Sequence, residues 1–153
     1  MKKAYFLLVF ALILALLLTG CTKEDQIGEK LCRIEIANAT EQSDVSVLEN
    51  QKQSDVTVFF DESNWTETTK TVNDLTPQYV ISLYQEKTPT VIKSENGDPY
   101  IKIMEYVTFE NSNIVKVSIS GGVVNNTLTE EYLSEYYVGS EKFFSALTEV
   151  SQG

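Results

Sequence analysis

Residues 101–119 read IKIMEYVTFENSNIVKVSI, and they carry the clearest secondary-structure signal in the chain. Apolar residues alternate with polar ones on both sides of Asn111-Ser112-Asn113, a run of turn-forming residues. Alternation predicts β-strands, and a short turn between two such runs predicts a hairpin. The residues that share one parity are Ile101, Ile103, Val107 and Phe109 before the turn, and Val115, Val117 and Ile119 after it.

The segments before this hairpin predict two further strands. Val56, Val58 and Phe60 alternate with Thr57 and Phe59, which suits a strand with a strong apolar face. Residues 61–64 supply turn formers, and the threonine-rich residues 66–72 predict a returning strand.

Two helices are also expected. Thr76-Pro77 has the pattern of an N-cap followed by proline at the first helical position, with a helix running to about Glu86. A second helix is expected from Thr127 or Thr129, where Glu130 completes a capping box. Its apolar stripe continues across a bend at Gly139 and consists of Leu133, Tyr137, Phe144 and Leu147.

The predicted order is strand, strand, helix, strand, strand, helix (ββαββα). It indicates an α+β domain with a small, open, mostly antiparallel sheet and two helices packed on one face. We expect this domain to cover residues 55–153. Residues 21–54 are mostly polar and are interpreted as a tether, except that Leu31 to Ile36 alternate as a short edge strand would.

The N-terminus has the pattern of a secretion signal. Lys2 and Lys3 precede fifteen uncharged residues from Ala4 to Leu18, and Thr19-Gly20 follow as a small-residue site. This run is shorter than the roughly twenty apolar residues of a membrane span. Leu18-Thr19-Gly20-Cys21 resembles the lipobox of bacterial lipoproteins.

The lipobox resemblance implies that residues 1–20 are removed by cleavage between Gly20 and Cys21. It also implies that Cys21 carries a diacylglycerol, which holds the chain on the outer face of the cell membrane. Two acyl chains are enough for stable anchoring. The alternative is an uncleaved anchor in which the cysteine is incidental.

Composition excludes several classes of function. Without the signal the chain has ten basic and twenty-two acidic residues, so nucleic-acid binding and polybasic membrane binding are not expected, and lipid on Cys21 is the one membrane signal. Histidine is absent, which removes Ser-His and Cys-His pairs and histidine-containing zinc sites. With Cys21 acylated, Cys32 has no partner for an intramolecular disulfide. We expect no metal and no cofactor.

Two residues are candidates for partner binding. Glu105 shares the apolar parity of its predicted strand, and a carboxylate directed into a core is either paired or functional. The favoured alternative is a bulge that turns it to water. Trp65, the sole tryptophan, could anchor a partner, although folding back over the sheet edge is the favoured interpretation.

Two other patterns have ordinary explanations. An aromatic stripe at helical spacing predicts core packing before a ligand or glycan site. It consists of Tyr132, Tyr136, Tyr137, Phe143 and Phe144. Glu95 and Asp98 flank a turn that could hold calcium, but their spacing does not match the EF-hand loop and a solvated acidic turn is favoured.

The order of elements, together with the segments 56–60, 75–77, 101–120 and 130–147, resembles the GerMN domain of bacterial sporulation and spore-germination lipoproteins. The resemblance implies an envelope module without catalysis, and it transfers no catalytic residue. Family members usually continue into another strand after the last helix, whereas this sequence stops at Gly153. The 31–36 strand is a candidate to fill that place.

The expected function is therefore a non-enzymatic interaction or assembly module of the envelope, with envelope or spore proteins as partners and an oligomeric state that the sequence leaves open. One alternative is a small cell-wall hydrolase that uses carboxylates alone, for which Glu105 is the candidate. Another is a ligand-binding or immunity lipoprotein with an apolar pocket.

Overall fold

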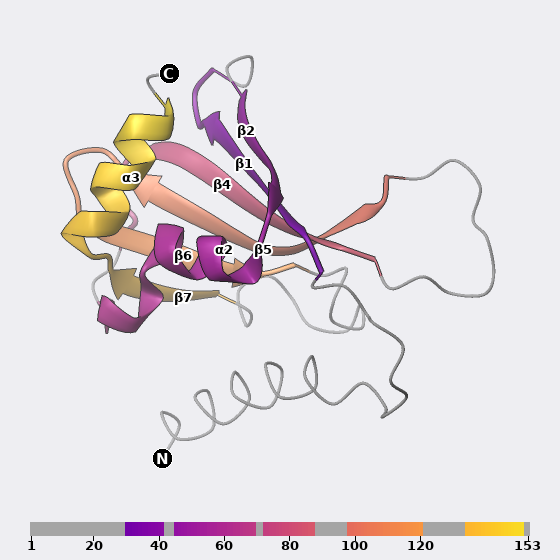
Figure 1. Cartoon of the computed structure of the whole chain (residues 1–153). Coiled ribbons are helices and arrows are strands. Elements are labelled where there is room, and N and C mark those ends of the chain that lie inside the picture. Colours follow the sequence, from indigo (N-terminus) through magenta and orange to yellow (C-terminus); the bar gives the residue numbers. More distant parts are fainter. Residues whose placement is uncertain (1–29, 42–44, 70–71, 88–97, 121–133, 152–153) are drawn as a thin grey trace.

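The structure is a computed structural model that describes residues 30–41, 45–69, 72–87, 98–120 and 134–151. Figure 1 follows the chain from the indigo first strand to the yellow last helix. The elements in chain order are β1 (Cys32–Asn38), β2 (Val45–Gln51), α2 (Gln53–Phe60), the 3-10 helix η1 (Glu62–Asn64), β3 (Thr66–Glu67), β4 (Pro77–Glu86), β5 (Tyr100–Phe109), β6 (Ile114–Ile119), β7 (Ser134–Val138) and α3 (Glu141–Ser151).

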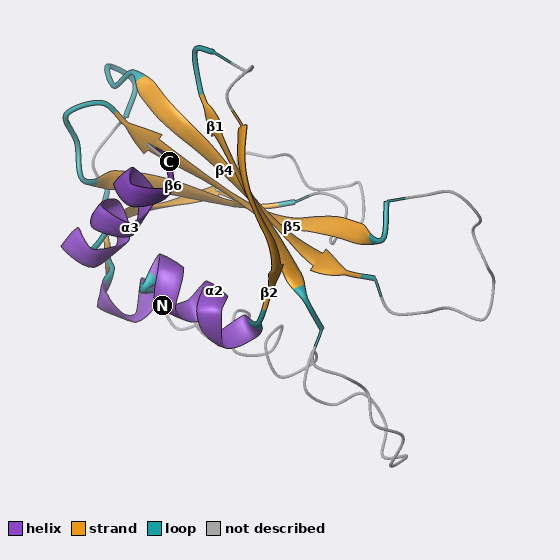
Figure 2. Cartoon of the chain, turned by 45° about the horizontal axis from the view of Figure 1, so that its top comes forward, coloured by secondary structure: helices purple, strands orange, loops and turns teal. Residues whose placement is uncertain are grey.

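The strands form one open sheet in the order β2-β1-β4-β5-β6-β7-β3. Every neighbouring pair is antiparallel, so β2 and β3 are the two edges. Helices α2 and α3 lie next to each other beside the sheet (Figure 2). The prediction of an α+β fold with an open antiparallel sheet and two helices is confirmed.

Side chains from both helices and from the sheet form one core. Each fully buried aliphatic or aromatic side chain contributes about 1.5–3 kcal/mol of transfer free energy, so this cluster is the main source of stability. Its buried members are Cys32, Ile34, Ile36, Val56, Phe60, Ile81, Leu83, Tyr106, Val115, Phe143 and Leu147.

The opposite surface of the sheet is called the outer face here. Successive residues of a strand point to opposite faces, so Arg33 and Glu35 on β1 point away from the core residues beside them. The register pairs Arg33 with Tyr84 and Glu35 with Ser82, and it pairs Ser82 in turn with Glu105. These five residues therefore share the outer face.

The predicted hairpin at residues 101–119 is confirmed as β5 and β6, which pair from Met104↔Ile119 to Thr108↔Val115. Asn111 adopts a left-handed backbone (φ 53°) in the turn. That conformation is one that asparagine tolerates better than most residues, which is why the turn signal was reliable.

The strand predicted at Val56 to Phe60 is wrong, because these residues belong to helix α2. Val56 and Phe60 are buried, whereas Val58 between them is 60% exposed. Residues four apart share one helical face, and the Asp55 carboxylate accepts a hydrogen bond from the Lys52 amide (3.1 Å) at the helix start. Four apolar residues in five satisfy a strand pattern and a helical one equally well.

The helix predicted from Pro77 to Glu86 is also wrong, because this segment is β4. It lies between β1 and β5, and Ile81, Ser82 and Leu83 are buried consecutively. Side chains of both parities are therefore buried in the middle of β4, and the alternation that identifies strands in a sequence is lost. Pro77 occupies the first position of the strand, where its missing N–H is tolerated.

The single long helix predicted at the end of the chain is wrong, because the segment forms a strand followed by a shorter helix. Residues 134–138 form β7, which pairs with β6 and β3, and α3 begins only at Glu141. Ser140 caps α3, since its Oγ accepts a hydrogen bond from the Phe143 amide (3.2 Å). The proposed start at Thr127, Thr129 and Glu130 lies outside the described residues.

The order ββαββα is replaced by β-β-α-β-β-β-β-β-α. The segment interpreted as a tether contributes β1 and β2 in its described part, and the strand expected at residues 31–36 lies between β2 and β4 instead of at an edge. The strand expected at residues 66–72 is reduced to the two residues of β3. β2 was not predicted, because its segment holds few apolar residues. Two of these, Val45 and Val47, are exposed.

Candidate functional site

Glu105 lies on the outer face of β5 and forms an ion pair with Lys102. The β4–β5 register is irregular between Leu83↔Met104 and Tyr84↔Lys102, so Ile103 is an extra residue in β5. This bulge changes the strand's phase, so that Tyr106 and Thr108 face the core instead of Val107. It also brings Lys102 and Glu105, three residues apart, to the same face. Glu105 is therefore a paired surface carboxylate.

Trp65 packs against the core and does not stand out from it. Its ring centroid lies 5.0 Å from that of Phe143, 6.1 Å from that of Tyr106 and 6.2 Å from that of Tyr137. Its Nε1 is buried without a hydrogen-bond partner in the described part of the chain. Because Trp65→Ala would remove these contacts, it would change folding as well as any binding.

The aromatic residues predicted as a helical stripe come from two elements. Tyr136 and Tyr137 lie on β7, Phe143 and Phe144 lie on α3, and Tyr132 is outside the described residues. Phe143 is fully buried and its ring contacts those of Phe59, Phe60, Trp65 and Phe144. These contacts account for Phe143 and Phe144 as core packing.

Partly buried Glu62 and buried Tyr106 form an acid–phenol pair that the sequence did not indicate. The Tyr106 hydroxyl donates a hydrogen bond to Glu62 Oε1 (2.7 Å). Burial raises the pKa of Glu62, and the hydrogen bond from Tyr106 opposes part of that rise. The pair depends on how η1 folds over β5, and the local sequence around residue 62 shows only a turn.

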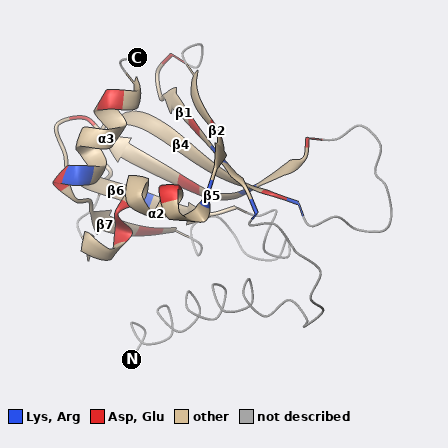
Figure 3. Ribbon diagram, in the orientation of Figure 1, with Lys and Arg blue, Asp and Glu red and all other residues tan. Residues whose placement is uncertain are grey.

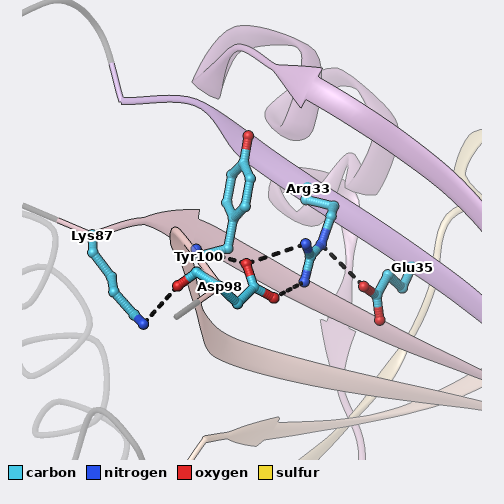
Figure 4. A network of polar contacts seen from close by, with 5 residues as sticks. All are labelled: Arg33, Glu35, Lys87, Asp98 and Tyr100. Carbon is cyan, nitrogen blue, oxygen red and sulfur yellow. Dashed lines mark hydrogen bonds and ion pairs between the residues drawn. The ribbon is translucent and has the colours of Figure 1, made fainter. Parts of the chain in front are cut away.

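Arg33 is the centre of a polar network on the outer face (Figure 4). Its two terminal nitrogens bind the Asp98 carboxylate, at 2.8 and 3.4 Å, and its Nε lies 3.0 Å from Glu35 Oε1. The guanidinium carbon lies 4.5 Å from the centroid of the Tyr84 ring and 4.9 Å from that of Tyr100.

This network joins β1 to the beginning of β5. The hydrogen bond from Arg33 lowers the pKa of Asp98, and the Tyr100 amide, which donates to the same carboxylate, adds to the effect. The Arg33 charge is compensated by two carboxylates and covered by two rings, so the cluster is a structural clamp. Asp98 is thus engaged with Arg33, while Glu95, at the other end of the acidic turn, lies outside the described residues.

The exposed apolar residues of the sheet are on the edge strand β2. Val45 is 46% exposed and Val47 is 45% exposed. The register places Val47 opposite Glu35 and Val45 opposite Ala37, so both valines lie on the outer face. Single exposed valines need no explanation, but two that share one face of a sheet edge form a small apolar strip.

Two classes of feature are absent from the residues that the structure describes. They contain no cluster of three or more histidine, cysteine, aspartate or glutamate side chains suited to a metal ion. No helix among them has both the length and the hydropathy of a membrane span. In the described part of the ribbon, acidic residues occur on both helices and on the sheet (Figure 3).

Comparison with known proteins gives no family assignment. No protein-family model, curated protein or solved structure matches this chain.

Proposed function

We propose that this chain is a lipid-anchored protein of the bacterial envelope whose folded part is a non-enzymatic interaction module. The observation that carries the interaction role is the edge strand β2, with its strip of exposed Val45 and Val47. Unpaired backbone groups on a sheet edge bind extended segments by strand addition, and exposed side chains select among them.

The anchoring part of the proposal rests on the sequence from Met1 to Cys21. We expect Cys21→Ser to abolish incorporation of labelled palmitate and to move the protein from the membrane fraction to the soluble or secreted fraction. Cys32→Ser is the matched control and should change neither property. Palmitate labelling that survives Cys21→Ser would overturn the anchoring site.

The resemblance to GerMN lipoproteins narrows the proposal to sporulation or spore germination. It supports the envelope role through the signal and through the pattern of residue types. Three of its four matched segments have a different secondary structure from the one expected, so the proposal depends more on β2 than on this resemblance. Expression confined to sporulating cells would support the narrower role.

The interaction role is tested by recovering partners of the full-length chain from its native envelope after chemical cross-linking. We expect Val47→Lys to reduce recovery, because a lysine on the strip would place a desolvated charge in the interface. Val58→Lys is the matched control, since Val58 is also exposed but lies on α2. Recovery of no partner by the wild-type chain would overturn the interaction role.

The alternative role, a hydrolase that works through carboxylates, requires two carboxylates facing one cleft. Glu105 lies on the outer face beside Lys102, whereas Glu62 accepts a hydrogen bond from Tyr106, whose buried ring belongs to the core on the other side of the sheet, so these two carboxylates do not face one cleft. Release of peptidoglycan fragments by the purified protein, lost on Glu105→Gln, would favour the hydrolase over the interaction module.

A further inference from the structure

Strand β2 is an edge strand whose exposed residues share one face. Among the described residues, β1 pairs with one side of β2 and no strand pairs with the other. Exposed and half-buried residues alternate along residues 45–49, so Val45, Val47 and Glu49 point to the outer face. Proteins usually protect a free edge with charges, with proline or with shortness, whereas the seven residues of β2 include one charge, that of Glu49.

The regular part of β2 ends after Glu49. Asn50 has a left-handed backbone (φ 56°), and the β1–β2 register shifts between Ile34↔Leu48 and Cys32↔Gln51. Such an irregularity bends a strand and interrupts its ladder of hydrogen bonds. The edge that an added strand can use therefore consists of residues 45–49, all of which the structure describes.

Glu49 differs from the other carboxylates of the outer face in having no basic partner. Glu35 is paired with Arg33 across 3.0 Å. Glu105 is likewise paired with Lys102. The Glu49 carboxylate is exposed and forms no ion pair within the part of the chain that the structure describes. The uncompensated charge thus lies on the strand where a partner would add.

These side chains define what an added strand must carry. Residues opposite each other in an antiparallel pair lie on the same face, with Cβ atoms about 4.5–5.5 Å apart. Aliphatic side chains opposite Val45 and Val47 would cover the apolar strip, and lysine or arginine opposite Glu49 would supply the missing counter-charge. Read from its N-terminus, the added strand has a basic residue first and aliphatic residues two and four positions later.

The charge of the whole chain favours the same kind of partner. Its formal net charge of −10 attracts a cationic segment and repels an acidic one. Every strand pair in the sheet is antiparallel, which is also the slightly more stable arrangement per residue. Five paired residues bury a small area, as in weak and transient complexes.

We propose that β2 binds an extended segment of another protein, paired antiparallel, with a basic residue opposite Glu49 and aliphatic residues opposite Val47 and Val45. This inference rests on the proposed function, since it names the chemistry of the partner for the interaction role. The contact is weak and reversible, and electrostatic attraction selects the basic segment over an acidic one of the same shape.

The test measures the binding of two labelled synthetic peptides to the full-length lipidated chain in nanodiscs of zwitterionic lipid. Such a bilayer has no net charge and does not itself attract a cationic peptide. The first peptide has the order lysine, threonine, valine, threonine, valine between glycines. The second has glutamate in place of the lysine. Fluorescence anisotropy gives the dissociation constant of each.

We expect the wild-type chain to bind the lysine peptide roughly tenfold more tightly than the glutamate peptide, because opposite charges replace like charges across from Glu49. Glu49→Lys should invert this preference, and Glu49→Gln should reduce it without inverting it. Glu149→Lys is the matched control, because Glu149 is exposed on α3 and the substitution changes the net charge equally. It should leave the preference unchanged.

The apolar part of the contact is tested separately. Val47→Lys should weaken binding of the lysine peptide by roughly tenfold, because it places a charge in the apolar strip beside the incoming lysine. Val58→Lys should have no effect, since Val58 is exposed on α2. Unchanged thermal transitions by circular dichroism would show that these variants remain folded.

Several outcomes would overturn the inference. Equal binding of the two peptides by the wild-type chain would remove the selection for a basic partner. An effect of Glu49→Lys no larger than that of Glu149→Lys would place the contact away from β2. If neither peptide binds while partners are still recovered from the envelope, the inference fails and the interaction role stands. If no envelope partner is recovered either, both fail.

Discussion

Glu62 is a partly buried carboxyl that accepts a hydrogen bond from the Tyr106 hydroxyl (2.7 Å). A buried carboxyl favours its neutral form, which is why its pKa lies above the ordinary value of 4.5. The groups around it on the neighbouring elements are Tyr106 on β5 and Tyr137 on β7. Burial is the main cause of the raised pKa of both phenols, and the Glu62 charge adds to the rise. The other charges that act on Tyr137 are Glu135 and Glu67, which are also acidic.

The sign of the resulting pH dependence follows from linkage. A group with a raised folded-state pKa contributes its full stability below the unfolded value, and this contribution is lost as the pH rises through the folded-state pKa. Relative to Glu62→Gln, the wild-type protein should therefore lose free energy of unfolding as the pH increases above 4.5. The measurement is urea denaturation of both proteins at a series of pH values.

The control for this prediction is Glu110→Gln. Glu110 is exposed in the turn between β5 and β6, so its substitution should leave the pH dependence unchanged. Parallel wild-type and Glu62→Gln profiles would mean that Glu62 ionises in the folded protein as freely as in the unfolded chain.

At the scale of elements, Asp61 and Ser140 join the two helices. Asp61 ends α2 in a left-handed conformation (φ 52°), and its Oδ2 accepts a hydrogen bond from Ser140 Oγ (2.7 Å). The hydrogen bond from Ser140 is the largest cause of the lowered pKa of Asp61, followed by that from Asn64. A lowered pKa has the opposite sign to that of Glu62, so this contribution is lost as the pH falls through the folded-state pKa.

Ser140 is also the N-cap of α3, so its hydroxyl serves both helices. We expect Ser140→Ala to lower the free energy of unfolding by about 1 kcal/mol through the lost cap, with a further loss from Asp61. Ser145→Ala provides the comparison, because Ser145 bonds only the Glu141 carbonyl within the exposed surface of α3. Equal stability of the two variants in thermal and urea unfolding would show that the cap is dispensable.

The sequence predicted some elements well because their signals are local. The β5–β6 hairpin has alternating residues and a compact turn, and both are read from neighbouring positions. β4 could not be predicted in this way, because its consecutive burial at Ile81, Ser82 and Leu83 results from β1 and β5 on its two sides. That arrangement becomes apparent only when residues far apart in the chain are placed together.

The sequence contains a signal for the start of α3, but the apolar stripe that crosses this point outweighed it in the prediction. Gly139-Ser140-Glu141 has a flexible residue, an N-cap and an acidic first turn, and it marks the start of α3. The apolar stripe continued across it in helical phase, because Tyr137 shares the face of its strand partner, the buried Val115, while Phe144 and Leu147 pack on the core from a helix. A Cβ on Gly139 would lie 2.9 Å from Phe144 Cε2 and 3.0 Å from Val115 Cγ2, so the junction is tightly packed.

The candidate site was predictable only in general terms. Trp65 and Glu105 were singled out by residue type, and the structure uses them for packing and for an ion pair. The pairs Glu62–Tyr106 and Arg33–Asp98 join residues that are 44 and 65 positions apart. No local pattern encodes such pairs, since each depends on the complete sheet.

For the molecule as a whole, β1 is part of the core sheet and not of a tether. Cys32, Ile34 and Ile36 are at most 2% exposed, and β1 pairs with seven consecutive residues of β4. A chain shortened to begin at Asp55 would expose β4 along its full length and lose three core side chains. We expect it to aggregate or to remain unfolded.

The comparison is a chain that begins at Lys30, which keeps β1 and β2. It should give a cooperative thermal transition by circular dichroism, whereas the chain from Asp55 should give none. A cooperative transition in the shorter chain would show that the sheet from β4 onward is an independent folding unit.

The shortness of β3 sets how far an assembly of this protein can grow. A sheet with two open edge strands can add subunits at both edges and build fibrils without limit. With one edge reduced to Thr66 and Glu67, β2 is the longer of the two edges in the described part of the sheet, and an isologous contact through β2 would use that edge in both molecules. Assembly by strand addition at this sheet would therefore stop after one added partner.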